Sequence, residues 1–137
     1  MSFTWNPALE TGNAAIDNQH KQLIGALNAL FDAYRNGKER QEVERTMDFL
    51  TGYAIKHFAD EEALQLKYCY PDYLVHRQLH SEFKGVVQEL AQALSRNGPT
   101  DDFIRTVYIT VGEWLVDHIK SEDFKMAVYV QRATKTT

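Results

Sequence analysis

Apolar side chains recur at steps of three and four residues along four long segments of this chain. Such spacing places them on one face of a helix, and that face needs another apolar face to pack against. The segments are separated by Gly37, by Tyr70-Pro71 and by Asn97-Gly98-Pro99, where glycine and proline favour turns. The stripes are Leu23, Leu27, Leu30, Phe31 and Tyr34; Val43, Met47, Leu50, Ala54, Phe58 and Leu64; Tyr73, Phe83, Val87, Leu90 and Leu94; and Ile104, Val107, Val111, Trp114 and Leu115.

The connections between these segments are short, so we expect consecutive helices to lie antiparallel. The chain of 137 residues has the length of one domain with a single hydrophobic core. We therefore predict one all-α domain, an up-down-up-down antiparallel four-helix bundle. Residues 1–16 are expected to form an irregular arm, residues 17–130 the bundle and residues 131–137 a polar tail. Asp17 is predicted to cap the first helix and Thr100 the fourth.

Composition excludes several classes of function. The formal net charge is −4 and no basic run appears, which argues against nucleic acid as a partner. No apolar stretch approaches the roughly 20 residues of a membrane span. Cys69 is the only cysteine, which excludes an internal disulfide and favours a reducing compartment. We expect a cytoplasmic protein, and the sequence names no protein partner.

The five histidines of the chain all fall on the apolar stripes. Each one lies three or four residues from a stripe residue, so each imidazole is expected to point into the core. The histidines are His20, His57, His76, His80 and His118.

Two carboxylates accompany the histidines. Glu61 follows His57 by four residues and therefore faces the same way. Asp123 follows His118 by five residues, a step that turns about 140° on an ideal helix. The helix is expected to bend, unwind or bulge there if both side chains reach one centre.

A buried histidine is more often a satisfied core residue than a ligand, but five on four helices are a different case. Unpartnered burial of a polar group costs roughly 1–3 kcal/mol. A folded domain has only about 5–15 kcal/mol of net stability. We therefore interpret the cluster as a metal site, in which bonds to the metal compensate the burial.

The type and number of ligands narrow the metal site. Imidazole nitrogens argue against calcium and magnesium, and mixed imidazole and carboxylate sets suit iron, manganese, cobalt or zinc. Seven ligands exceed the four of one zinc and fit two metals bridged by both carboxylates. Two octahedral metals offer about twelve positions, and the seven side chains with a bridging solvent oxygen leave about one open. If three histidines bind one metal and two bind the other, the open position lies on the two-histidine metal.

The sequence resembles the hemerythrin family, in particular its bacterial type. The resemblance rests on motifs in order along nearly the whole chain. They are Ile16-Asp17-Asn18-Gln19-His20, His57-Phe58-Ala59-Asp60-Glu61-Glu62, Tyr70-Pro71, His76-Arg77-Gln78-Leu79-His80 and His118-Ile119-Lys120-Ser121-Glu122-Asp123.

The resemblance implies two non-haem irons with an oxo or hydroxo bridge. One iron would be held by His76, His80 and His118, and the other by His20 and His57. The bridging carboxylates would be Glu61 and Asp123. Four other acids near the motifs are expected to be solvated or capping rather than ligating. They are Asp17, Asp60, Glu62 and Glu122.

The resemblance also implies reversible dioxygen binding for storage, transport or delivery, with dioxygen as the partner. The ligand set is rich in neutral imidazoles, whereas oxygen-activating di-iron bundles use more carboxylates. We therefore expect a carrier rather than an enzyme. Two alternatives stay open: an oxygen- or redox-sensing module of a signalling system, and an iron-handling or peroxide-detoxifying protein.

Overall fold

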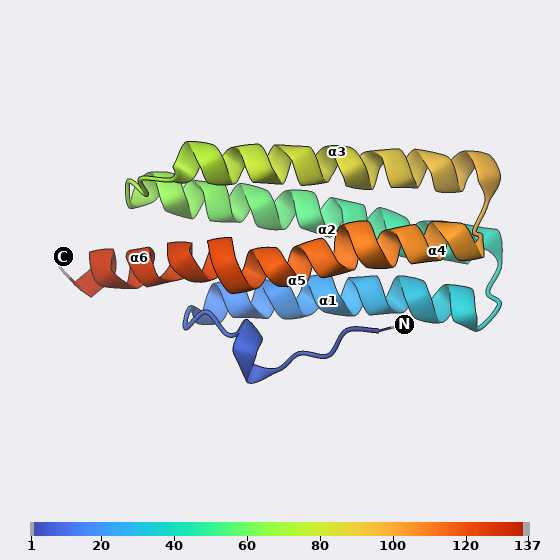
Figure 1. Cartoon of the computed structure of the whole chain (residues 1–137), viewed down its shortest axis with the longest axis horizontal. Coiled ribbons are helices and arrows are strands. Elements are labelled where there is room, and N and C mark those ends of the chain that lie inside the picture. Colours follow the sequence, from blue (N-terminus) through green and yellow to red (C-terminus); the bar gives the residue numbers. More distant parts are fainter. Residues whose placement is uncertain (1, 136–137) are drawn as a thin grey trace.

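The protein, described here from a computed structural model of residues 2–135, is a bundle of four helical rods (Figure 1). The connections between consecutive rods alternate between the two ends of the bundle, so neighbouring rods run antiparallel. This arrangement confirms the predicted all-α bundle and its topology. The first three rods are α1 (Ala14–Arg35), α2 (Arg40–Lys67) and α3 (Tyr73–Asn97), and the fourth comprises α4 (Asp101–Val107), η2 (Tyr108–Glu113), α5 (Trp114–His118), η3 (Ile119–Asp123) and α6 (Phe124–Lys135).

The ends of the helices follow local capping chemistry. The Asn13 side chain accepts a hydrogen bond from the Ile16 backbone N–H and caps α1. The prediction that Asp17 caps this helix is wrong, because Asn13 starts the helix one turn earlier. The Asp17 carboxylate accepts instead from the backbone and hydroxyl of Thr11. The predicted cap at Thr100 is confirmed, since its hydroxyl accepts from the Phe103 N–H.

The two termini differ in detail from the expected boundaries. Helix α1 begins at Ala14, inside the range assigned to the arm, and the arm contains a short 3₁₀ turn, η1 (Pro7–Leu9). Helix α6 continues to Lys135, so most of the expected polar tail is helical. The last two residues of that tail, 136 and 137, lie outside the described residues.

The fourth rod contains two wide, π-helical turns, η2 and η3. A π turn closes its hydrogen bond five residues along the chain, so it brings residues i and i+5 to the same side of the rod. The second of these turns joins His118 to Asp123. The distortion expected from the five-residue spacing is therefore confirmed.

Two apolar clusters fill the bundle, one on each side of the buried histidines. The larger contains Leu23 and Leu27 of α1 and Leu115 of α5, together with buried residues of α2 from Val43 to Phe58 and of α3 from Phe83 to Leu94. The smaller, near the α2–α3 connection, consists of Ile16, Tyr70, Met126, Ala127 and Val130. On α1, α2 and the fourth rod the histidines and acids fall between residues that pack in the two clusters, so the polar side chains form a layer across the core.

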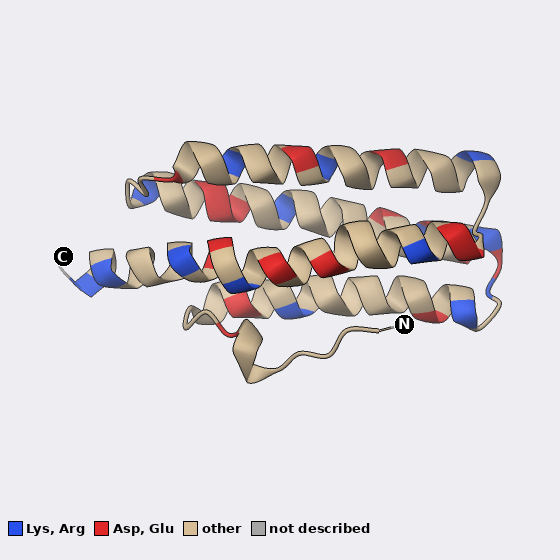
Figure 2. Cartoon of the chain, in the orientation of Figure 1, with Lys and Arg blue, Asp and Glu red and all other residues tan. Residues whose placement is uncertain are grey.

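Charged residues lie along the rods, with acidic and basic side chains interspersed (Figure 2). This distribution agrees with the absence of a basic run from the sequence. Within residues 2–135, no helix combines the length and the apolar character that a bilayer span requires.

The N-terminal arm is anchored over α1 and η2. The backbone N–H of Phe3 donates to the Asn28 side-chain oxygen at 2.9 Å, and the Asn28 amide donates back to the Phe3 carbonyl at 2.7 Å. The Phe3 ring stacks on Tyr108 and covers Gly112. A Cβ atom at Gly112 would lie 2.3 Å from the Phe3 ring, so only glycine allows this approach.

Gly112→Ala is therefore expected to displace Phe3 and to destabilise the protein by about 1–3 kcal/mol, as overpacking does. Gly25→Ala is the matched control, because a Cβ atom there meets nothing within 4 Å and alanine favours the helix. Chemical denaturation would measure both free energies of unfolding. Equal effects of the two substitutions would contradict the packing of Phe3 on Gly112.

Candidate metal centre

The five histidines and both predicted carboxylates converge inside the bundle, and none is more than 4% exposed. All four rods contribute. His20 comes from α1, the pair at positions 57 and 61 from α2, the pair at positions 76 and 80 from α3, and the pair at positions 118 and 123 from the fourth rod. On α2 and α3 the spacing of four residues puts both members on one face, and on the fourth rod η3 does so.

The two oxygens of Glu61 face different histidines. Glu61 Oε2 lies 3.4 Å from His20 Nε2 and 3.2 Å from His57 Nε2. Glu61 Oε1 lies 3.2 Å from His80 Nε2 and 3.7 Å from His76 Nε2. The carboxylate therefore spans two separate sets of imidazoles.

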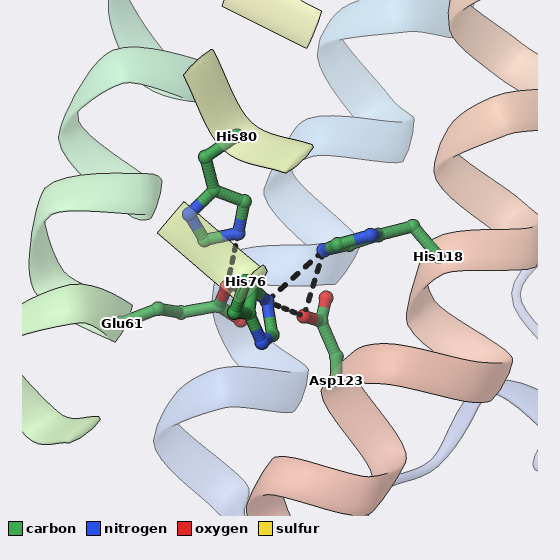
Figure 3. Close-up of side chains that lie close together, drawn as sticks. All are labelled: Glu61, His76, His80, His118 and Asp123. Carbon is green, nitrogen blue, oxygen red and sulfur yellow. Dashed lines mark hydrogen bonds and ion pairs between the residues drawn. The ribbon is translucent and has the colours of Figure 1, made fainter. Parts of the chain in front are cut away.

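Asp123 divides its oxygens in the same way. Its Oδ2 lies 2.9 Å from His20 Nε2. Its Oδ1 lies 2.9 Å from His76 Nε2 and 3.1 Å from His118 Nε2, and these two nitrogens are themselves 3.1 Å apart (Figure 3). Three polar atoms from two rods thus converge on one point.

The side chains accordingly form two groups that share both carboxylates. In each group the candidate ligand atoms lie within 4.8 Å of one another. Each carboxylate directs one oxygen to each group, as two carboxylates that bridged a pair of adjacent cations would have to do. One group is His20, His57, Glu61 and Asp123, and the other is His76, His80, His118, Glu61 and Asp123.

The polar atoms at the centre of the cluster fit metal ions. Among residues 2–135, the Nε2 atoms of His20, His57 and His80 make no contact of hydrogen-bond geometry, although they are buried. The same holds for all four oxygens of Glu61 and Asp123. Atoms that lie close together without pairing leave a large burial penalty, which bonds to cations would offset. The mixture of imidazole and carboxylate suits a transition metal.

The two carboxylates also control the protonation of the metal-free site. Burial alone lowers the pKa of His20, but the carboxylates of Asp123 and Glu61 outweigh it and raise the pKa to about 9. The pKa of His76 is raised in the same way, burial being outweighed by Asp123. Burial raises the pKa of Asp123, but its contacts with His118, His20 and His76 hold it well below the usual value. Without a metal, the charges therefore compensate one another.

Two polar side chains that were not predicted to belong to the site contact the Nδ1 atoms of two of its histidines. His57 Nδ1 lies 2.7 Å from Gln19 Oε1, and His80 Nδ1 lies 2.9 Å from Glu62 Oε2. Glu62 was expected to be solvated or capping rather than ligating, but its side chain is only 18% exposed and contacts His80. It neighbours Glu61 on α2 and reaches across to α3, a contact that spacing along one helix does not reveal.

Aromatic rings pack against two of the imidazoles. Phe58 stacks on His80 with ring centroids 4.0 Å apart, and Trp114 stacks on His118 at 4.4 Å. Such stacking restricts the rotation of a ring whose nitrogen must be aimed. The apolar neighbours therefore orient the cluster as well as excluding water.

Comparison with known proteins identifies the family. The model of the Hemerythrin HHE cation binding domain matches residues 11–130. The chain belongs to this family. The hemerythrin domain binds a non-haem di-iron centre and dioxygen, which agrees with the two groups of buried ligand atoms.

Individual hemerythrins resemble the chain over most of its length. The bacteriohemerythrin of Methylococcus capsulatus (strain Bath) is 31% identical, with 88% of this chain and 91% of the relative covered. The myohemerythrin of Sipunculus nudus is 27% identical, with 90% and 89% covered. A crystal structure of a hemerythrin with one leucine replaced by alanine has a TM-score of 0.82 at 28% identity, covering 95% of this chain and 98% of that one.

The metal-free protein is expected to lose stability as the pH rises from about 6.5 to 9. The pKa of His20 is higher in the folded chain than its ordinary 6.5, so protonation stabilises the fold fully below 6.5 and no longer above the folded pKa of about 9. The contribution is on the order of 3 kcal/mol. Melting temperatures of the metal-free protein and of His20→Gln across this range would measure it. A wild-type protein that is as stable at pH 9 as at pH 6.5 would contradict the prediction.

Proposed function

We propose that this protein binds dioxygen reversibly at a non-haem di-iron centre, for storage, transport or delivery of oxygen. Two histidines would hold one iron and three the other, and both carboxylates would bridge the pair. The observation that carries the proposal is the division of each carboxylate between two groups of imidazoles. The proposed ligands are His20, His57, Glu61, His76, His80, His118 and Asp123.

The unequal division of the histidines supports a binding site with one accessible iron. When bound, the irons supply the electrons with which dioxygen is held. The group of His20 and His57 has one imidazole fewer than the other, so we assign the dioxygen position to it.

The surrounding side chains support binding without further reaction. Phe58, Leu27, Ile119 and Leu115 are all at most 2% exposed and form an apolar wall that keeps bulk water out. The imidazoles are neutral ligands, which stabilise high-valent iron less than carboxylates do. We therefore propose a carrier rather than an enzyme, and we keep the cytoplasm as its compartment because the one cysteine favours reducing conditions.

Anaerobic stopped-flow mixing of the diferrous protein with dioxygen tests the proposal. A charge-transfer band is expected to appear rapidly and to disappear when the oxygen is removed. Rapid irreversible oxidation with release of peroxide would contradict it and would support an iron-handling or detoxifying protein. Oxygen-dependent binding to a separate signalling protein would instead support a sensor.

Glu61→Ala is expected to reduce bound iron from two per chain towards one or none, because both groups lose an oxygen ligand together. Glu82→Ala is the matched control on α3, since the Glu82 carboxylate is exposed and accepts a hydrogen bond from the nearby Gln78 amide. Iron per chain, measured by elemental analysis of purified protein, distinguishes the two. Full iron content in Glu61→Ala would contradict a bridging role.

A further inference from the structure

A layer of three buried side chains, two of them from the smaller apolar cluster, lies beside the proposed metal centre. On three rods, the residue four positions from a proposed ligand, towards the α2–α3 connection, is buried. Since residues four apart share a helix face, these side chains lie on the same faces as the proposed ligands. They are Ile16 beside His20, Gln65 beside Glu61 and Ala127 beside Asp123.

Gln65 is the polar member of this layer. Its side chain is fully buried, and neither its Nε2 nor its Oε1 has a hydrogen-bond partner among residues 2–135. The hydroxyl of Tyr70, which belongs to the same small cluster, is also buried and unpartnered within that range. Buried polar groups of native proteins almost always have a partner, and a buried water molecule is a common one.

Tyr70 is fixed close to both Gln65 and the metal site. Its backbone N–H donates to the Gln65 carbonyl at 2.9 Å, where the chain leaves α2. Its ring lies edge-on to the His76 ring, with centroids 6.4 Å apart. Tyr70 also lines a surface pocket of about 450 Å³.

His76 is the histidine that brings this layer into contact with the proposed function. Its Nε2 faces Asp123, so a metal-bound His76 carries its hydrogen on Nδ1 and needs an acceptor there. The equivalent Nδ1 atoms of His57 and His80 have partners in Gln19 and Glu62. His76 Nδ1 is buried and has none within the described chain, as is also true of His20 Nδ1, but it is the His76 ring that Tyr70 contacts.

We propose that Gln65 and Tyr70 hold a buried water molecule that accepts the hydrogen bond of His76 Nδ1–H. The water donates one hydrogen to Gln65 Oε1 and the other to the Tyr70 hydroxyl oxygen, which with the bond from His76 gives about the three bonds typical of buried water. A water bridges polar groups that are too far apart to bond directly. Gln65 and Tyr70 are thus positioning residues for His76, a role that rests on the proposed function because it assigns Nε2 to the metal.

Two variants remove one bond each from this water. Gln65→Met keeps the volume and removes the amide, and Tyr70→Phe removes the hydroxyl. Gln78→Met and Tyr129→Phe are matched controls, because the Gln78 amide is exposed and the Tyr129 hydroxyl donates to the backbone carbonyls of Tyr68 and Cys69.

Iron release to a chelator measures the effect on the metal site. Each variant is expected to release iron at least about tenfold faster than the wild type, as loss of an outer hydrogen-bond partner does, and the controls at the wild-type rate. The double variant Gln65→Met/Tyr70→Phe is expected to match the faster single variant, because both residues act through one water. Unchanged release, or effects that multiply in the double variant, would overturn the proposal.

Stability of the metal-free protein separates positioning from packing. Gln65→Met is expected to leave the melting temperature of the metal-free protein unchanged, because its amide already has a water partner in the wild type. An increase would mean that the amide is buried without a partner and would overturn the proposal.

A crystal structure of the metal-free protein tests the water independently of iron. Ordered water within about 3 Å of the Gln65 amide and the Tyr70 hydroxyl is expected. A dry layer would overturn the proposal. Failure of the wild type to take up two irons would contradict the proposed function instead, so the two results are distinguishable.

Discussion

Two buried carboxylates determine how the inside of this bundle is organised. Glu61 and Asp123 each present one oxygen to one group of imidazoles and the second oxygen to the other. The negative charge of a buried carboxylate is so unfavourable in isolation that it needs a cation close by. In the metal-free chain protonated imidazole supplies that charge, as the raised pKa of His20 indicates, and in the proposed loaded state iron supplies it. The same atoms therefore serve the stability of the fold and the binding of metal.

This requirement explains why the fourth rod is not a regular α-helix. His118 and Asp123 are five residues apart and reach one centre because η3 is a π turn. The earlier π turn, η2, contains Gly112, on which the Phe3 ring of the N-terminal arm packs. The η3 turn thus brings Asp123 into the polar layer, and the η2 turn provides the surface on which the N-terminal arm packs.

Much of the fold and of the cluster could be predicted from the sequence. The spacing of apolar residues and the positions of glycine and proline are local signals that can be read from one segment at a time. Steps of three and four residues revealed the helix faces, and the histidines fell on those faces. The five-residue step from His118 to Asp123 even required a distortion, which η3 provides. All seven residues that were predicted as ligands lie in the buried cluster.

The remaining features depend on contacts between rods, which no single helix encodes. Glu62 reaches His80 on another helix, and Gln19 reaches His57, so spacing along one segment could not identify either contact. Asp17 carries a capping residue type, yet Asn13 takes that role because the helix starts earlier. Gln65 lies in helical register with Glu61, but spacing alone does not show that its amide is buried without a hydrogen-bond partner among residues 2–135.

The central claim is that Glu61 and Asp123 each bind two irons, with one oxygen on each iron. Anomalous diffraction at the iron edge from crystals of the iron-loaded protein tests it most directly. The account predicts two iron peaks in each chain, one bound by His20 and His57 and the other by the three remaining histidines. Each peak would contact one oxygen of Glu61 and one of Asp123. A single peak, or a pair in which either carboxylate binds only one iron with both oxygens, would contradict it.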